Sequence, residues 1–326
     1  MTKVALDCLG GDHGSTPLIE GAIAALKEKS NVELFLVGDE EELKISIPQK
    51  LRDRCQIIHT DEFINMDAPS TEALRRKDSS IYICMELLRE KRVDAVVSAG
   101  HSGATMSLAT LRVGRIEGIT RPAIATFLPQ IDGSRALLLD AGANMDCKAE
   151  HLVQFAILGR EYAKDIIKKE NPRVGLLSIG SEKSKGDELT KDTYEMLEGS
   201  EGFIGNVEGN DLFGAKVDVI VCDGFVGNVV LKTGEGTGEA IGAIIKQKTK
   251  KSPFAIIGAM LMKKIFKELK KDIDYAEYGG APLLGVNGCV IIGHGKSNSK
   301  AIKNAIFQAC TVVNSGYVAH AKSKVQ

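Results

Sequence analysis

Tryptophan is absent from this 326-residue chain, and the three aromatic residue types together make up only 5% of it. No apolar run approaches the roughly 20 residues that a membrane-spanning helix needs, which argues against an integral membrane protein. The formal net charge is −1, and a chain without a basic surplus has no general attraction for nucleic acid. The N-terminal residues predict a strand and no signal peptide.

Cysteine is present but follows no pattern. The seven cysteines are scattered and odd in number, and none forms a C-x-x-C pair. Disulfide frameworks and zinc sites need such spacing, so neither is expected. Most of these residues lie in apolar runs, so we expect reduced, buried thiols in a cytoplasmic protein without a metal site.

Short apolar runs rich in β-branched residues alternate with helical patterns along the chain. Continuous rather than alternating apolar strands are typical of a parallel sheet covered on both faces. The expected strands are Lys3–Asp7, Val32–Val37, Gln56–His59, Ala95–Ser98, Ala123–Phe127, Ala136–Asp140, Val174–Ser178, Phe203–Asn206, Val217–Cys222 and Val290–Ile292. The expected helices include Thr16–Lys29, Ser80–Glu90, Lys148–Lys169 and Ser299–Asn314. No linker divides the chain, so residues 1–326 are predicted to form one three-layer α/β/α domain.

Four strands run into glycine-rich turns followed by helices. The four stretches are "VALDCLGGDHG" from Val4, "SAGHSGA" from Ser98, "VDVIVCDGFVGNVV" from Val217 and "CVIIGHGKSN" from Cys289. In an open parallel sheet, such joints gather at the carboxyl ends of the strands, where ligands bind. Small residues let an anion approach backbone N–H groups, and a helix N-terminus attracts negative charge. Glycine could equally serve only to make tight turns, but four joints together favour an anion site.

Nucleotide-binding motifs fail on spacing. "DCLGGDHG" does not fit G-x-G-x-x-G, and "HGKSN" lacks the first glycine of a P-loop, because Val290 stands at that position. A small anion such as phosphate needs only amides and a cation or two. Lysines that follow a strand in "IGSEKSKGDELT" supply one candidate, Lys185, although lysine is more often simply solvated.

The chain resembles the PlsX family of bacterial acyl-carrier-protein:phosphate acyltransferases. The matching stretches are "DCLGGDHG", "RRKDSS", "SAGHSGA", "RPA", "LLLDAGAN", "IGSEKSKGDELTK", "FIGNVEG", "CDGFVGNVVLKTGEG" and "YGGAPLLGVNG". The resemblance implies an isocitrate/isopropylmalate-dehydrogenase-like fold, a homodimer, and transfer of a long fatty acyl group from acyl carrier protein to inorganic phosphate without a cofactor. It also implies a downstream membrane glycerol-3-phosphate acyltransferase that uses the acyl phosphate in phospholipid synthesis.

The family usually has Asn-Thr where this chain has His101-Ser102, so a histidine there is not a general catalytic base. Phosphate is already partly dianionic at neutral pH and a thiolate leaves easily, so positioning and oxyanion stabilisation are the main requirements. We therefore expect direct attack by phosphate, with Lys185, Asp223 and Asn228 as catalytic residues. The expected phosphate and thioester contacts are Gly10, Gly11, Asp12, Ser98, Gly100, His101, Ser102, Gly103, Gly180, Glu182, Gly224, Gly227 and Lys232. Asp7 and Asp12 could instead stabilise turns.

The segment 246–275 differs from the rest because lysines crowd one face of a predicted amphipathic helix. Such a helix suits an anionic membrane surface, a dimer partner or the acidic carrier protein. The residues expected to make this contact are Ile257, Met260, Leu261, Lys263, Lys264, Phe266 and Lys267. The chain is thus expected to be cytoplasmic and peripherally attached to the inner face of the cell membrane.

Three other functions remain open from the residues. A nicotinamide-dependent dehydrogenase of the same fold would not need the dinucleotide motif, but no metal-binding carboxylate cluster is evident. A phosphotransacetylase would use a short acyl-CoA. A phosphate or carrier-protein sensor at the membrane would bind without turnover.

Overall fold

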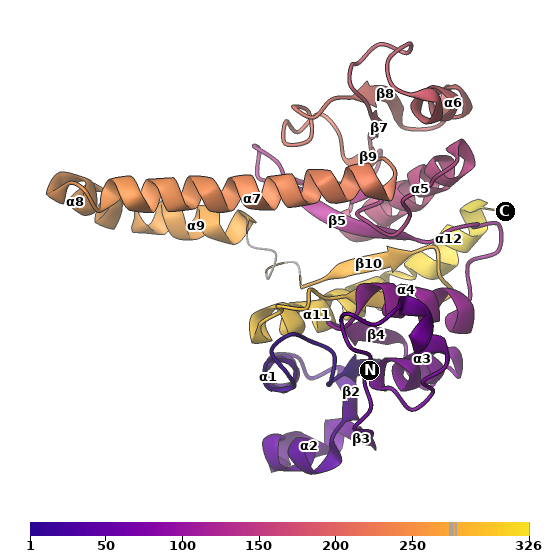
Figure 1. Cartoon of the computed structure of the whole chain (residues 1–326), viewed down its shortest axis with the longest axis vertical. Coiled ribbons are helices and arrows are strands. Elements are labelled where there is room, and N and C mark those ends of the chain that lie inside the picture. The colour runs from indigo at the N-terminus through magenta and orange to yellow at the C-terminus, as the bar shows by residue number, and fades with distance from the viewer. Residues whose placement is uncertain (274–276, 278, 326) are drawn as a thin grey trace.

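The computed structural model describes residues 1–273, 277 and 279–325. It confirms a three-layer α/β/α fold, with helices on both faces of a central sheet (Figure 1). The strands are β1 (Thr2–Asp7), β2 (Val32–Gly38), β3 (Cys55–His59), β4 (Ala95–Ser98), β5 (Ala123–Pro129), β6 (Arg135–Leu139), β7 (Val174–Leu177), β8 (Phe203–Val207), β9 (Val219–Val221), β10 (Ala281–Leu284) and β11 (Cys289–Ile292). The helices are α1 (Thr16–Glu28), α2 (Glu40–Ser46), α3 (Ser80–Arg89), α4 (Ser102–Leu108), α5 (Ala149–Tyr162), α6 (Glu188–Leu197), α7 (Gly224–Thr249), α8 (Pro253–Leu261), α9 (Lys263–Ile273), α11 (Ser299–Ser315) and α12 (Tyr317–Val325).

The sheet consists of two parallel halves joined by antiparallel strands, in the order β3-β2-β1-β4-β11-β10-β5-β6-β9-β7-β8. The strands from β3 to β11 are parallel, and so are those from β6 to β8. Antiparallel pairing at β11–β10, β10–β5 and β5–β6 reverses the direction between them. The expectation of a single row of four glycine-rich joints is therefore wrong. Three joints follow β1, β4 and β11, and the fourth follows β9 in the oppositely directed half.

Buried strands explain why continuous apolar runs predicted the sheet well. Every residue of β4, β9 and β11 is buried, as expected for strands covered on both faces. One apolar core lies on the face of α1, α5 and α11, and a second lies on the other face under α3 and α4. Strand β10 was not predicted. The predicted helix from Lys148 ends earlier, because α5 passes into a π-helical turn at Ala163–Ile167 and stops at Lys168, whose φ is 63°.

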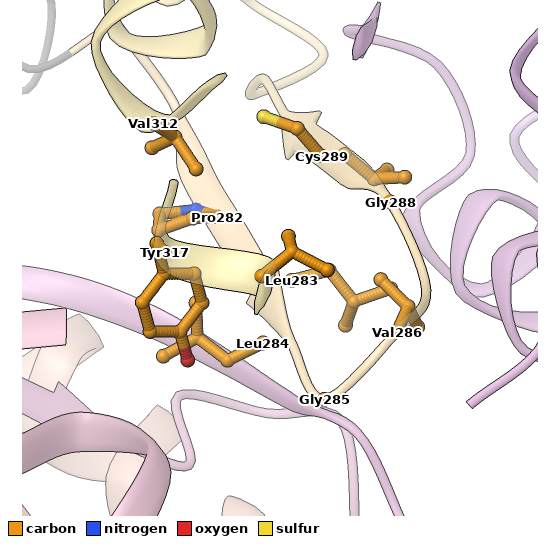
Figure 2. Close-up of a pocket in the computed structure, with 11 residues that line it drawn as sticks. Pro282, Leu283, Leu284, Gly285, Val286, Gly288, Cys289, Val312 and Tyr317 are labelled. Atoms are coloured by element: carbon orange, nitrogen blue, oxygen red, sulfur yellow. The ribbon is translucent and has the colours of Figure 1, made fainter. Parts of the chain in front are cut away.

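A cavity of about 10 Å³ lies between β10, β11 and the α11–α12 junction (Figure 2). Pro282, Leu284, Val312 and the ring of Tyr317 are among the side chains that line it. Its volume is about that of one water molecule, and its lining is mostly apolar. It is a packing defect of the core, too small for a substrate.

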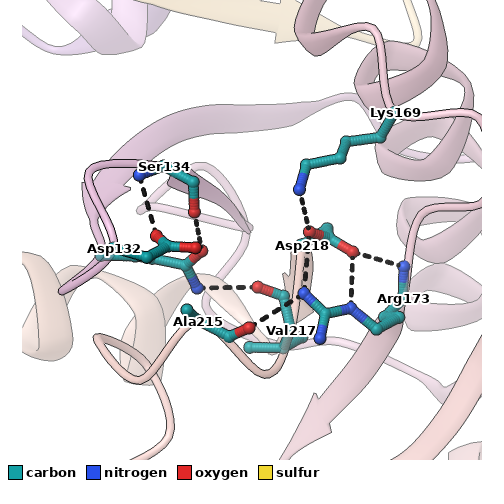
Figure 3. Close-up of polar contacts among 8 residues, drawn as sticks. Asp132, Ser134, Lys169, Arg173, Ala215, Val217 and Asp218 are labelled. Atoms are coloured by element: carbon teal, nitrogen blue, oxygen red, sulfur yellow. Dashed lines mark hydrogen bonds and ion pairs between the residues drawn. The ribbon is translucent and has the colours of Figure 1, made fainter.

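A buried ion pair holds the amino ends of β7 and β9 together (Figure 3). Asp218 is 2% exposed and accepts from the Arg173 backbone and guanidinium at 2.9 Å, while Lys169 Nζ lies 3.2 Å from it. Burial alone would raise the pKa of Asp218, but the hydrogen bonds from Arg173 and Lys169 outweigh it and lower the pKa. Arg173 and Asp218 precede β7 and β9, whereas the polar turns follow these strands at their other ends. The ion pair therefore has a structural role.

A helical arm extends away from the sheet (Figure 1). The 26 residues of α7 span about 39 Å, yet only Gly224 and Gly227 of this helix are buried. Helix α8 lies at the far end of the arm, and α9 runs back from it toward the sheet in this view. The amphipathic segment 246–275 thus comprises the end of α7, α8 and α9, divided at Ser252 and Met262 rather than forming one continuous helix. Residues 274 and 275 lie outside the described residues.

None of the helices that the structure describes is long and apolar enough to cross a membrane.

Candidate active site

The turns after β1 and β4 are built on one buried carboxylate. Asp7 Oδ1 accepts from the backbone N–H of Gly10 at 3.0 Å, and Asp7 Oδ2 accepts from the Ser98 hydroxyl at 2.8 Å. Ser98 Oγ in turn accepts from the N–H of Gly100 at 3.2 Å. Asp7 is 2% exposed. Its carboxylate is thus used within the turns, which supports the turn-stabilising role of Asp7.

Glycine is required in these turns because their backbones touch. A Cβ on Gly10 would lie 2.5 Å from Asp7 Oδ2 and 2.8 Å from the Cα of Gly100. The turn after β11 joins them, since the N–H of Asp12 donates to the carbonyl of Gly295 at 2.8 Å. The structure therefore brings Gly10, Gly11, Asp12, Ser98 and Gly100 together, as the sequence predicted for neighbouring joints.

His101 caps helix α4. Its Nδ1 accepts from the N–H of Ala104 at 3.1 Å, and its Nε2 lies 2.8 Å from the carbonyl of Ala68. Since a carbonyl can only accept, the ring is the neutral tautomer with its proton on Nε2. Both ring nitrogens thus make hydrogen bonds. Gly103 packs directly against the ring, since a Cβ built on Gly103 would lie 3.0 Å from His101 Cε1. Ser102 is exposed at the first turn of α4.

A second buried carboxylate, Asp140, organises the turn after β6. It accepts from the N–H groups of Ile124, Gly142, Ala143 and Asn144 at 2.7–3.2 Å, and from the Asn144 side chain at 2.8 Å. Burial raises the pKa of Asp140, and these hydrogen bonds oppose that rise. Asp140 was not predicted as a site residue, although "LLLDAGAN" carried the signal of an acid directly after a buried strand.

The first turn of α7 packs on the Asp140 turn. Asp223 caps α7 by accepting from the N–H groups of Phe225 and Val226 at 2.8 and 2.9 Å. Gly224 donates to the carbonyl of Asn144 at 2.7 Å, and Asn228 lies against Gly142. The structure thus groups Asp223, Gly224, Gly227 and Asn228, but in the half of the sheet that does not hold Gly10 and Gly100. Lys232 lies further along α7, with Nζ 2.8 Å from Glu235.

The third polar turn connects β7 to α6 and carries Lys185. The N–H of Lys185 donates to the carbonyl of Glu182 at 3.0 Å. A Cβ on Gly180 would lie 2.9 Å from Lys185 Cγ and 3.0 Å from a Glu182 carboxylate oxygen, so both side chains pack over this glycine. Lys183 Nζ lies 2.7 Å from Glu198. For the exposed Lys185 ammonium, no hydrogen bond or ion pair is found in the described part of the chain.

Two buried polar atoms beneath the Lys185 turn lack hydrogen-bond partners among the described residues. They are Ser178 Oγ, at the end of β7, and Asn206 Oδ1, on β8. An unsatisfied buried polar atom typically costs about 1–3 kcal/mol, so each of the two calls for an explanation, of which a functional role is one. Neither residue was predicted from the sequence. The polar asparagine inside the strand "FIGNV" was the available signal for Asn206.

The cysteines offer no activated nucleophile. All seven are free, and five are fully buried. Burial raises the pKa values of Cys55 and Cys147 to about 11, and it raises those of Cys8, Cys84 and Cys222 well above the ordinary value. Because the thiolate is the nucleophile, these environments disfavour a covalent acyl-cysteine.

An open groove of about 750 Å³ runs between the start of α5 and α6. Its lining residues are Cys147, Lys148, Ala149, Glu150, Glu188, Leu189, Asp192, Glu195 and Met196. None of them is a predicted site residue. Elsewhere too, no group of three or more His, Cys, Asp or Glu side chains in the described ranges is arranged to hold a metal ion.

The predicted contact residues of segment 246–275 lie at the end of the arm. Ile257, Met260 and Leu261 on α8 are 57%, 69% and 83% exposed. On α9, Lys263, Lys264 and Lys267 are exposed and Phe266 is partly buried.

Comparison with known proteins links the chain to one group of enzymes. The family model for fatty acid synthesis proteins matches residues 2–320. A phosphate acyltransferase from Wolinella succinogenes is 58% identical over 314 residues, which cover 96% of this chain and 95% of that protein. One from Campylobacter concisus is 57% identical over 315 residues, with 97% and 95% covered.

Solved structures share the fold at low sequence identity. A phosphotransacetylase from Streptococcus pyogenes superposes with a TM-score of 0.62 at 19% identity, covering 96% of this chain and 94% of that one. A branched-chain phosphotransacylase from Enterococcus faecalis gives 0.61 at 12% identity, covering 96% and 99%. A Salmonella typhimurium protein assigned as a 4-hydroxythreonine-4-phosphate dehydrogenase gives 0.51 at 13% identity, with 96% and 99% covered. At these identities the likeness concerns the fold alone.

Proposed function

The chain belongs to the PlsX family of phosphate acyltransferases, and from this premise we propose that it transfers a long-chain fatty acyl group from acyl carrier protein to inorganic phosphate. The product is an acyl phosphate, which a membrane glycerol-3-phosphate acyltransferase uses to begin phospholipid synthesis. The reaction needs no cofactor.

The observation that carries this proposal is the ammonium of Lys185 at the carboxyl end of β7, for which the described residues offer no partner. Lys183, in the same turn, is paired with Glu198, and Lys232, on α7, is paired with Glu235. Lys185 instead projects from a turn whose backbone is fixed, and its charge is available for an anion. A single fixed cation suits a phosphate or the developing oxyanion of a thioester better than a nucleotide, which needs several contacts.

In the proposed reaction, an oxygen of hydrogen phosphate attacks the thioester carbonyl carbon. The new C–O bond forms a tetrahedral oxyanion, whose charge Lys185 stabilises. The C–S bond then breaks, and the carrier-protein thiolate takes up the proton that phosphate brought. Atoms and charge balance without an acyl-enzyme, in keeping with the raised pKa values of the cysteines.

Other predicted residues have supporting parts. In the turns after β1 and β4, Gly11 and Gly103 are the proposed contacts for phosphate or the thioester, because the N–H groups of Gly10 and Gly100 are already donated to Asp7 and Ser98. Asn228, in the other half of the sheet, is proposed to orient the substrate. One carboxylate oxygen of Asp223 accepts the hydrogen bonds that cap α7. The proposed role of Asp223 is therefore to hold the first turn of α7 beside the substrate.

The test is acyl phosphate formation, trapped with hydroxylamine as the hydroxamate. Palmitoyl–acyl carrier protein with phosphate should give product in proportion to phosphate, and acetyl-CoA should give far less. Faster turnover of acetyl-CoA would identify a phosphotransacetylase. Phosphate binding without turnover of either thioester would identify a sensor, and tight NAD(P) binding would revive the dehydrogenase.

The arm supplies the proposed contact with an anionic membrane, at the inner face of the cell membrane. Apolar α8 residues lie at its tip, and the α9 lysines lie beside them, the combination that favours an anionic lipid surface. Leu261→Gln should weaken binding to phosphatidylglycerol vesicles several-fold. Ile45→Gln is the control, because Ile45 on α2 is equally exposed, at 83%. Equal effects of the two variants would contradict the proposal.

We also propose a homodimer that pairs through the exposed apolar residues of α7. Ile241, Ile244 and Ile245 are 53%, 54% and 38% exposed along this helix. Their exposure in one chain is costly, and a second copy would cover them. Sedimentation of the wild type and of Ile244→Glu tests this proposal: a dimer that becomes a monomer supports it, and a wild-type monomer contradicts it. The α9 lysines additionally attract the acidic carrier protein.

A further inference from the structure

The turn that carries Lys185 is long and exposed, so something must fix its backbone if the ammonium is to meet a substrate. The turn runs from Ser178 at the end of β7 to Asp187, which caps α6 through its contact with Thr190 N at 2.8 Å. Lys185 itself is exposed. The two ends of the turn are therefore anchored by β7 and α6, and the middle needs its own support.

Asn206 supplies that support from the neighbouring strand. Its Nδ2 donates to the carbonyl of Glu182 at 2.9 Å, and the same carbonyl accepts the N–H of Lys185 at 3.0 Å. One carbonyl oxygen thus links the side chain of Asn206 to the backbone of Lys185. Asn206 is 7% exposed, so little solvent competes for this contact.

Lys183 of the same turn forms an ion pair with Glu198 and lies over the Tyr194 ring, but these contacts involve its side chain and not a peptide group of the turn. The contacts of Gly180 and Gly186 are steric. The Lys185 stem packs over Gly180, and a Cβ on Gly186 would lie 3.0 Å from Ser178 Oγ. These contacts limit where the turn can lie but do not fix the direction of its peptide groups. The hydrogen bond from Asn206 does, because it requires the Glu182 carbonyl to point toward β8.

The position of Asn206 would otherwise suit an apolar residue. It pairs with Leu176 of β7, which is 1% exposed and belongs to the core. Asn206 Oδ1 is buried without a partner in the described part of the chain. A buried amide with half of its hydrogen-bonding capacity unused is a poor choice for packing alone. The hydrogen bond from Nδ2 to the Glu182 carbonyl is the interaction that explains an asparagine at this position.

We infer that Asn206 is a positioning residue for Lys185: through the Glu182 carbonyl, it sets the backbone from which the Lys185 ammonium reaches the reacting anion. The inference rests on the proposed role of Lys185. It adds a residue that touches no substrate and acts through the turn.

A double-mutant cycle tests the inference with the palmitoyl–acyl carrier protein assay. Asn206→Ala should lower kcat/KM by about 10-fold in the wild-type background and by less than about 2-fold in the Lys185→Ala background. Thr193→Val is the matched control. Thr193 is fully buried on α6 and loses one hydrogen bond, to the Leu189 carbonyl at 2.7 Å, away from the turn. It should leave kcat/KM unchanged.

Each other outcome overturns the inference in a distinguishable way. Equal losses in both backgrounds would mean that Asn206 acts independently of Lys185. A fully active Asn206→Ala beside an impaired Lys185→Ala would reject Asn206 alone, whereas a fully active Lys185→Ala would reject the role of the lysine and the positioning with it. If Asn206→Ala fails to fold, the similarly sized Asn206→Leu, which has no donor, takes its place. Failure of both to fold would assign Asn206 to stability only.

Discussion

The main-chain oxygen of Asp140 occupies the space that a side chain on Gly227 would need, since a Cβ built on Gly227 would lie 1.8 Å from it. The contact joins the first turn of α7 to the turn after β6. Because α7 buries only Gly224 and Gly227, the whole arm is attached to the sheet largely through this base. A residue far from the apolar tip therefore determines how the arm is held.

Gly227→Ala should destabilise the fold by about 3 kcal/mol or more, because backbone atoms on both sides of the contact would have to separate. Thermal unfolding and limited proteolysis within α7 measure the effect. Gly236→Ala is the control in the same helix, since its added Cβ meets nothing within 4 Å. Alanine there should be neutral or stabilise by about 0.5–1 kcal/mol. A stable Gly227→Ala protein with an intact arm would show that the base does not carry the attachment.

His101→Asn should retain activity within about 3-fold and keep the pH–rate profile between pH 5 and 8. An asparagine oxygen can replace Nδ1 as the acceptor for Ala104 N, since asparagine is a favourable N-cap. His101→Ala should lose about 1 kcal/mol of stability, because the cap disappears. Steady-state kinetics across pH and thermal unfolding distinguish the two effects. A 100-fold loss of activity in His101→Asn, or the disappearance of one limb of the pH–rate profile, would show that His101 acts as a general base.

Asp218 should make the free energy of unfolding depend on pH in the acid range. Its pKa in the fold is lowered from the ordinary value of 3.8, so its contribution is fully present above about pH 4 and is lost as pH falls through the lowered native pKa. Asp218→Asn should therefore flatten the loss of stability below pH 4. At pH 7 it should cost about 1–3 kcal/mol, because Arg173 and Lys169 lose their shared partner. Urea unfolding at several pH values measures both, and an unchanged acid limb would contradict the assignment.

The sequence predicted those features correctly that depend on a single strand or turn. Continuous apolar runs located strands such as Ala95–Ser98 without error, and small residues marked the turns that contact one another at Gly10 and Gly100. Direction between distant strands was not predictable. The two antiparallel pairings of the four-residue strand β10 cancel, so β5 has the direction of β11, and the antiparallel β5–β6 pairing then reverses the sheet.

Local patterns also gave incomplete accounts of individual residues. The glycines of "CDGFVGN" were interpreted only as contacts for phosphate or the thioester, but Gly224 and Gly227 are also needed for packing against Asn144 and Asp140. Asn206 was overlooked because its meaning comes from the Glu182 carbonyl, 24 residues away in the chain. Such roles depend on tertiary contacts, which no spacing rule encodes.

We propose above all that the ammonium of Lys185, without a partner among the residues that the structure describes, acts on the phosphate or on the thioester oxyanion. The most direct measurement compares Lys185→Ala with Lys183→Ala, two lysines of the same turn, in phosphate-dependent formation of palmitoyl phosphate. Lys183 is already paired with Glu198, so its loss should change kcat/KM by less than about 3-fold, as for a surface ion pair. Lys185→Ala should lose 100-fold or more, roughly 2.7 kcal/mol. Equal activities of the two variants, with both folded, would contradict the account.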